Sequence, residues 1–310
     1  MAIKIEMLRS FLTVAEEGNI KDAATRLLRT PSAVSMTLSA LEDELGGPLF
    51  EQDRKSRLTV LGTYVRDMAE VMIRDHDRGI ETIKAFAQSR LGRLHIVAVP
   101  SVASRILPPI LREFLRRQSG AAVSLVDTDS HQVQQMVVTG EADIGIGGPP
   151  PGKLPLSFAP LFEDPFRLVC AVESPLARLP RPLCWQDLLT EDLIVNESAR
   201  AINAPEYAEM VDKARLTIRN ITSLLAMVRA NAGVTLLPAL ACTTLPAGLT
   251  ALEIETGGVS RVVGLVQRSN SMPSPLATTF VKQLNEQLRE VLSHSIGLYP
   301  GHVDGVDAPT

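Results

Sequence analysis

The chain of 310 residues is long enough for two or three domains with sizeable cores. Its 45% apolar and 21% charged residues are typical of a globular protein, and with only 4% aromatic residues the cores must be filled by aliphatic side chains. A formal net charge of −4 excludes a basic surface over the whole chain. Any contact with nucleic acid must therefore come from a local patch.

The sequence lacks the usual signals for export, membrane insertion or disulfide formation. The segment MAIKIEML has no signal-peptide core, and no apolar run approaches the roughly 18 residues that span a bilayer. We therefore expect a cytoplasmic protein with no membrane partner. Cys170, Cys184 and Cys242 are far apart, with no CxxC motif and no nearby His, which favours buried reduced thiols.

The amino-terminal stretch predicts two helices that cross at close range. Residues 5–17 follow a helical apolar rhythm, and Gly18 can end this helix. Asn19 can cap a second helix, in which Ala23 and Ala24 are small enough to let another helix approach closely.

The next stretch, TPSAVSMTLSALEDEL, predicts a third helix over residues 30–45. Thr30 can cap it, and Pro31 suits its first position. Apolar residues at spacings of four, three and four form a stripe that faces a core: Val34, Leu38, Leu41 and Leu45. A helix, a tight turn and a capped helix form the helix-turn-helix arrangement, whose second helix enters a DNA groove. Taken alone, this segment is equally typical of an ordinary surface helix.

A charged hairpin is predicted after Phe50. The segment EQDRKSRLT alternates around a charged tip, which favours a wing with Arg54, Lys55 and Arg57 at its end, where cations can neutralise phosphates. The alternative is a solvated charge run.

Thr59 can cap a long helix that runs to about residue 88. Its apolar residues form the seam of a coiled-coil-like pair, which favours self-association: Leu61, Val65, Met68 and Met72. Asp75 and Gly79 interrupt this pattern.

From Arg93 onward, short apolar runs alternate with helices, which predicts a parallel sheet with helices on its faces. A second α/β set begins near Phe166. Two such units in tandem predict two lobes with a cleft between them, the usual place for a small ligand. The last helix, residues 277–292, should return to the first lobe, and the residues after Tyr299 are typical of a disordered tail.

The ordered set of motifs resembles the LysR-type transcriptional regulators over about residues 5–295. The motifs are FLTVAEEGN, AATRL, the SAVS…LE stretch, LEDELGGPLF, RLTVLG, GRLHIVAVPSVASRILPPIL, GEADIGIG and LLAMVRANAGVTLLP. The resemblance implies an α/β fold with a helix-rich amino-terminal winged helix-turn-helix and a two-lobed, periplasmic-binding-protein-like effector domain. The implied segments are 1–58 for DNA binding, 59–89 for a linker and dimerisation helix, 90–300 for the effector domain and 301–310 for the tail. Lobe 1 would hold about 90–163 and 267–300, and lobe 2 about 164–266.

The resemblance also implies partners and a function. The implied partners are double-stranded DNA, a small-molecule effector and other copies of the chain, as a dimer or, as such regulators typically act, a tetramer, and RNA polymerase is a further candidate. The implied function is sequence-specific promoter binding that the effector modulates. The alternatives are a small-molecule-binding protein or enzyme on a two-lobed fold, or a regulator with no ligand.

The DNA-reading stretch departs from the family pattern. The family usually has Ser, Gln and Pro or Ser where Thr30, Pro31 and Ser32 stand, and a basic or polar residue in place of Met36. Losing the Gln removes a side chain that can bond to base edges, so the operator cannot be copied from relatives. Arg29 can reach a phosphate instead. The expected DNA-binding residues are Arg29, Thr30, Pro31, Ser32, Ser35, Met36, Ser39, Arg54, Lys55 and Arg57.

For the effector, the resemblance points to segments that follow strands. The residues are Ser101, Val102, Asp129, Ser130, Gly147, Gly148, Asn196, Ser198, Ile221 and Thr222. Loops that enter helix amino termini present unpaired N–H groups, which suit a carboxylate or another anion. Alternatively, Ser101, Ser130 and Thr222 are simply helix caps.

Catalysis finds little support in the sequence. The 5 histidines show no metal-ligand spacing, and neither GxSxG nor GxxxxGK occurs. We therefore expect no catalytic residues, no metal and no cofactor. His131 is a minor candidate for an effector contact.

Overall fold

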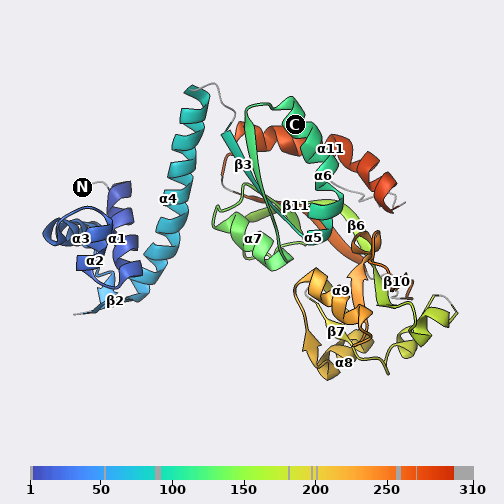
Figure 1. Ribbon diagram of the computed structural model, residues 1–310. Helices are drawn as coiled ribbons and strands as arrows, with labels where there is room; N and C mark the ends of the chain where they lie inside the picture. Colours follow the sequence, from blue (N-terminus) through green and yellow to red (C-terminus); the bar gives the residue numbers. More distant parts are fainter. Residues whose placement is uncertain are drawn as a thin grey trace. The chain divides into compact units, whose positions relative to one another are not determined.

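The computed structural model divides into two compact units, Met1–Ser89 and Arg90–Thr310 (Figure 1). The structure describes residues 3–51, 54–87, 92–180, 182–196, 198–199, 202–255, 260–269 and 271–296. The expected tail, residues 301–310, lies outside these ranges. Within them, no helix has the length and apolar character that crossing a membrane requires.

The first unit begins with three helices, α1 (Ile5–Glu17), α2 (Ile20–Arg26) and α3 (Pro31–Leu45). The predicted ends are confirmed: Gly18 is left-handed at φ 71°, and the Asn19 side chain accepts the Asp22 N–H at 2.8 Å. Thr30 accepts the Ala33 N–H at 3.3 Å. The core between the helices contains the two small alanines and the predicted stripe: Phe11, Val14, Ala23, Ala24, Val34, Leu38 and Leu41.

A hairpin connects α3 to the long helix α4 (Val60–Ala87). Strands β1 (Phe50–Glu51) and β2 (Arg54–Leu58) pair antiparallel, as the wing prediction requires, and residues 52–53 lie outside the described ranges. Thr59 caps α4 by accepting the Gly62 N–H at 2.9 Å. Gly62 meets the hairpin so closely that a Cβ there would lie 2.0 Å from the Leu49 carbonyl oxygen.

The seam predicted along α4 is divided between two roles. Leu61 and Val65 pack into the core of the first unit, so they are not free to face a partner. Met68 and Met72 are exposed, as are Tyr64 and Ile83 on the same helix. The sequence pattern therefore overstates the surface that is available for self-association.

Lobe 1 of the second unit contains a sheet that is only partly parallel. Strand β3 (Gly92–Ala98) runs parallel to β4 (Ala121–Asp127) and to β5 (Ile144–Gly147), as expected. Strand β11 (Ser260–Arg268) pairs antiparallel with β5 on one side and with β6 (Leu156–Ala171) on the other, which corrects the expected all-parallel sheet.

Helices cover both faces of this sheet (Figure 1). Helix α7 (Ser130–Val138) packs against β5, whereas α6 (Leu107–Arg117) and α11 (Pro275–Ile296) pack together on the other face. The rings of Phe114 and Phe280 join α6 to α11 edge to face, 5.3 Å apart. The expected return of the last helix to lobe 1 is confirmed. The short helix α5 (Pro100–Arg105) directly follows β3.

Lobe 2 contains short elements around one half of β6. Strands β9 (Thr235–Pro238) and β10 (Leu249–Leu252) both pair with β6, and β7 (Ile194–Val195) pairs with β8 (Leu216–Thr217). The remaining elements are the 3-10 turns η1 (Pro175–Arg178) and η2 (Trp185–Asp187) and the helices α8 (Pro205–Lys213), α9 (Ile221–Arg229) and α10 (Ala239–Cys242).

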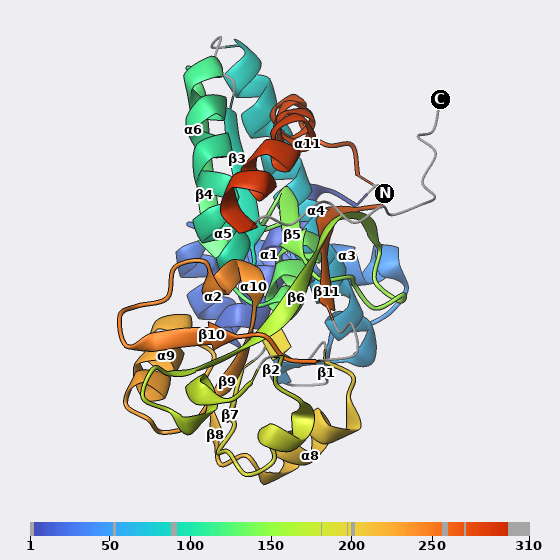
Figure 2. The ribbon, with the colours of Figure 1, turned by 90° about the vertical axis from the view of Figure 1, so that its right-hand side faces the viewer.

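The strand β6 belongs to both lobes and connects them (Figure 2). Its first half contributes Phe162 to the core of lobe 1, and its second half contributes Leu168 to the core of lobe 2. The chain returns on β11, where Val263 and Leu265 already lie in the core of lobe 1. The chain therefore re-enters lobe 1 before residue 267, which is where the sequence analysis placed this lobe boundary.

Candidate DNA-binding surface and effector site

The outward face of α3 is uncharged over its first three turns. Helix capping and the buried stripe fix the orientation of α3, which leaves Ser32, Ser35, Met36 and Ser39 exposed. The side chain of Met36 is 74% exposed. Acidic residues lie at the other end of α3, where Glu42 accepts the Leu49 N–H at 2.8 Å and fixes the turn. The first half of α3 can therefore approach a base edge without repulsion from phosphates.

The turn before α3 contains a feature that sequence reasoning missed. Leu28 adopts a left-handed conformation, with φ 54°, and its side chain is 93% exposed. Such a conformation is unfavourable for a residue with a Cβ, and no local pattern signals it. Arg29, Thr30 and Pro31 follow, and all three are exposed.

The basic residues of the wing lie on the strand β2. Arg54 and Lys55 begin this strand, and their side chains lie outside what the structure describes. Arg57 lies further along β2 rather than at the end of the hairpin, and its guanidinium is 3.6 Å from the Glu51 carboxylate. A phosphate that binds Arg57 must therefore compete with Glu51.

Replacing Arg57 with Ala should weaken binding to every DNA sequence by a similar factor, because a phosphate contact is insensitive to sequence. The slope of log affinity against log salt concentration should fall by about 1. Titrations of labelled duplexes at several salt concentrations measure both effects. Arg116→Ala, which removes an exposed Arg from the second unit, is the matched control. A loss confined to one sequence would contradict the phosphate role.

Three of the predicted effector segments meet at one edge of the lobe 1 sheet. They follow β3, β4 and β5, whose carboxyl ends share this edge because the strands are parallel neighbours. Ser130 accepts the Gly148 N–H at 3.0 Å, which ties two of the segments together. Sequence reasoning missed Gln134, whose buried side-chain amide donates to the carbonyls of Gly148 and Pro149 at 3.2 and 3.1 Å.

The structure limits the roles expected for Val102, Ser130 and Ser101 in lobe 1. Val102 is fully buried in the core, so its side chain is not available to a ligand. The alternative that Ser130 merely caps a helix also fails, because Asp129 caps α7 by accepting the Gln132 N–H at 3.0 Å. Ser101 is likewise not a cap, since it lies inside α5 after Val99.

In lobe 2, the predicted residues have different surroundings. The amide of Asn196 is buried and fully engaged: it donates to Thr235 Oγ1 at 2.9 Å and to the Leu236 carbonyl at 2.8 Å, and it accepts from Ser198 and from the Ala199 N–H. Asn196 therefore supports the fold rather than presenting a free group.

At the start of α9, Asn220 is the cap, accepting the Ser223 N–H at 3.0 Å. The cap alternative is therefore wrong for Thr222 as well. Thr222 is exposed and Ile221 is half-buried, so both side chains lie at the surface of lobe 2.

Two further residues that sequence reasoning missed lie where the lobes connect. Asp164 on β6 is fully buried, and Arg261 on β11 donates to its carboxylate at 2.8 Å. Arg261 also donates to Ser101 Oγ at 2.6 Å, so this ion pair reaches one of the predicted effector residues.

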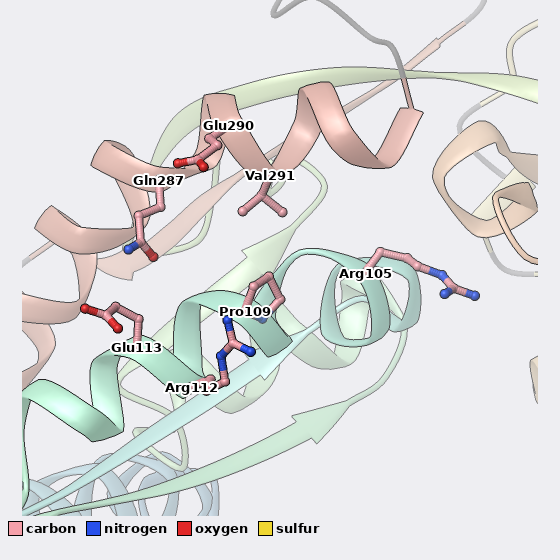
Figure 3. Close-up of a pocket in the computed structure, with 7 residues that line it drawn as sticks. All are labelled: Arg105, Pro109, Arg112, Glu113, Gln287, Glu290 and Val291. Carbon is pink, nitrogen blue, oxygen red and sulfur yellow. The ribbon is translucent and has the colours of Figure 1, made fainter.

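A surface pocket of about 360 Å³ lies between α6 and α11, on lobe 1 (Figure 3). Arg105 extends away from the other residues that line it (Figure 3). Hydrogen bonds from Arg116 and Arg117 occupy the Glu113 carboxylate and lower its pKa to about 2. The cations and acids around this pocket balance, so it offers little attraction to an anion.

Cys242 lies near the Asp164 carboxylate, and the surroundings of its thiol make the thiol a poor nucleophile. Burial raises the pKa of its thiol to about 12, and the charge of Asp164 acts in the same direction. The thiol therefore stays protonated at neutral pH, with a thiolate fraction on the order of a thousandfold below that of an ordinary cysteine.

We expect iodoacetamide to label Cys242 rapidly in urea and very slowly in the folded chain, as measured by mass spectrometry. Equal rates in both states would contradict this.

Two segments of the chain match known families. Residues 5–63 match the bacterial regulatory helix-turn-helix protein, lysR family, and residues 87–289 match the LysR substrate binding domain. These matches cover both units, and the second alone spans more than half of the sequence. The fold and the matches define a transcriptional regulator with a helix-turn-helix domain and an effector-binding domain. The chain belongs to the LysR family.

Similar proteins extend over nearly the whole chain. It is 29% identical over 300 residues to the "Probable HTH-type transcriptional regulator LrrA" of Synechococcus elongatus, covering 93% of this chain and 99% of the relative. It is 24% identical over 287 residues to an uncharacterized HTH-type transcriptional regulator, YbhD, of Escherichia coli, covering 90% of each. The crystal structure of CbnR, a LysR family transcriptional regulator, shares the fold at a TM-score of 0.64 and 22% identity, covering 92% of this chain and 99% of that one.

Proposed function

We propose that this regulator binds specific sites on double-stranded DNA as an assembly of identical chains, and that a small-molecule effector between the lobes modulates this binding. The observation that carries the DNA-binding role is the capped helix α3, whose exposed first half is uncharged and which the wing follows in the same unit. The proposed division of labour is residues 1–58 for DNA, 59–89 for subunit pairing and 90–300 for the effector. Family membership favours this function over a solute-binding protein or an enzyme.

The proposed DNA contacts fall into two groups. Residues on the outward face of α3 would approach base edges: Ser32, Ser35, Met36 and Ser39. Residues at the start of α3 and on the wing would contact phosphates: Arg29, Thr30, Arg54, Lys55 and Arg57. Pro31 would lie at the same DNA surface without donating a hydrogen bond, because proline has no N–H group. Base contacts select the sequence, whereas phosphate contacts fix the position of the protein on the duplex.

Replacing Met36 with Ala should change the preference among sites. Met36 is uncharged and exposed on the reading face, so we expect a loss of about 1–3 kcal/mol on the preferred site and little change on random duplex. Competition binding on both duplexes measures the difference. Met272→Ala, a change at an exposed methionine of the second unit, should affect neither. An equal loss on both duplexes would reject the base contact.

Self-association is proposed through the exposed apolar face of α4. Tyr64, Met68, Met72 and Ile83 are apolar and exposed on one helix, and an exposed apolar stripe of this kind favours pairing with a second copy. A dimer would place two α3 helices on one duplex, and two dimers would form the tetramer.

The proposed effector is a small anion held where the segments after β3, β4 and β5 meet. The amino terminus of α7 lies there, and α9 provides a second helix amino terminus in lobe 2. The first turn of a helix presents backbone N–H groups that have no intrahelical partner, which suits an anion. Ser101, Ser130 and Gly148 are the lobe 1 candidates, and Ile221 and Thr222 are those of lobe 2. RNA polymerase is a further candidate partner, and the proposed place of action is the cytoplasm.

A genome-wide map of bound sites tests the proposed function. We expect discrete peaks upstream of promoters that share an interrupted inverted repeat. A variant with both Ser35→Asp and Ser39→Asp on α3 should lose these peaks, because two added carboxylates would meet phosphates. A map without discrete peaks, or one that this variant leaves unchanged, would contradict the proposal.

A further inference from the structure

The Asp164 carboxylate is a meeting point for segments of both lobes. It lies on the connecting strand β6 and is 0% exposed. One oxygen accepts the Leu240 N–H of α10 at 3.0 Å, and the other accepts Nε and Nη2 of Arg261 on β11 at 3.2 and 2.8 Å. The same Nη2 atom donates to Ser101 Oγ on α5 at 2.6 Å. Four elements therefore meet around one buried ion pair.

Burial fixes the orientation of Arg261. Its side chain is only 10% exposed, and a charge removed from water is stable only when it is paired. Two N–H groups of the planar guanidinium bind the same carboxylate oxygen, so the group cannot rotate without breaking this pair. The Nη2 donor is consequently held against Ser101.

This contact determines what the Ser101 hydroxyl can do. A guanidinium has donors and no acceptor, so Ser101 Oγ must accept in this bond. Among the described residues, this is the one hydrogen bond that the Ser101 hydroxyl makes, although the residue is only 6% exposed. The O–H hydrogen therefore stays available as a buried donor, and leaving such a donor unpaired is costly.

We propose that Arg261 is a positioning residue that holds Ser101 as a hydrogen-bond donor toward the effector, and that the effector presents a carboxylate oxygen to it. This inference rests on the proposed effector site. The positive charge of Arg261 is balanced by Asp164, so selection at this point comes from hydrogen-bond polarity rather than from net charge. An ammonium group can only donate hydrogen bonds, so it could not accept the hydrogen bond that the Ser101 hydroxyl offers.

The test uses the thermal unfolding of the full chain with a panel of small aliphatic and aromatic carboxylates. Each carboxylate is paired with the amine of the same carbon skeleton, which is a donor only. We expect some carboxylates to raise the midpoint of unfolding and their amines to leave it unchanged. Ser101→Ala should weaken binding of a stabilising carboxylate at least tenfold, whereas Ser101→Thr, which keeps the hydroxyl, should retain most of it.

Arg261→Lys separates the positioning role from a general structural one. Lys keeps the positive charge opposite Asp164 but lacks the planar guanidinium, whose N–H groups reach both Asp164 and Ser101. We expect the same tenfold loss as for Ser101→Ala and no further loss when the two changes are combined, because Arg261 acts through Ser101. Arg167→Lys, at an Arg paired with Glu253 at 2.9 Å in lobe 2, is the matched control and should bind the carboxylate normally.

Several results would overturn the inference. They are stabilisation by the amines, carboxylate binding that Ser101→Ala leaves unchanged, additive losses in the double variant, and no stabilisation of the unsubstituted chain by any carboxylate. Each of these leaves DNA binding in the absence of a ligand untouched. A loss of DNA binding in the unsubstituted chain would instead contradict the proposed function itself.

Discussion

Replacing Asp164 with Ala should lower the free energy of unfolding of the second unit by about 3–5 kcal/mol, because it leaves the Arg261 guanidinium buried without its counter-charge. The Leu240 N–H loses its acceptor at the same time. Urea unfolding followed by tryptophan fluorescence measures the effect, since the single tryptophan of the chain, Trp185, lies in the core of lobe 2.

The matched control is Glu253→Ala. Glu253 also pairs with an arginine of β6, Arg167, but its side chain is 63% exposed, so we expect a change under about 1 kcal/mol. Equal effects of the two substitutions would show that burial does not set the strength of the Asp164 pair.

Gly62→Ala should destabilise the first unit by at least about 3 kcal/mol. A Cβ at this position would lie 2.0 Å from the Leu49 carbonyl oxygen, and backbone atoms on both sides cannot give way cheaply. The hairpin and the start of α4 would have to separate, so DNA binding should fall with stability. Hydrogen exchange at the amides of α1, α2 and α3 reports on this unit alone.

Gly79→Ala on the same helix is the matched control and should have the opposite sign. A Cβ there meets nothing within 4 Å, and replacing a glycine inside a helix by alanine stabilises it by about 0.5–1 kcal/mol. Faster exchange in the Gly79 variant, or unchanged exchange in the Gly62 variant, would contradict this account of the junction.

Local chemistry made the DNA-binding unit predictable. The cap at Thr30, the left-handed Gly18 and the stripe along α3 each depend on residues within a few positions of one another. The seam on α4 was predicted less well. An apolar stripe does not reveal whether it packs within the chain or against a second copy, and here Leu61 and Val65 pack within it.

The second unit shows where sequence reasoning ends. Strand β6 contains Pro160 and Pro165, which are disfavoured within strands, so its length of 16 residues gave no clear periodic signal. The pair of Asp164 and Arg261 joins residues 97 positions apart, and only the tertiary fold brings them together. For the same reason, the burial of Val102 and the engaged amide of Asn196 could not be inferred from position alone.

The most direct test of the central claim is competition binding of the purified full chain at moderate salt. The labelled probe is the duplex upstream of its own gene, and the competitors are the same duplex unlabelled and random duplex of equal length. We predict that the specific competitor displaces the probe at a concentration at least about a thousandfold below that of the random one. Displacement by both at the same concentration would contradict the claim that this chain reads a DNA sequence.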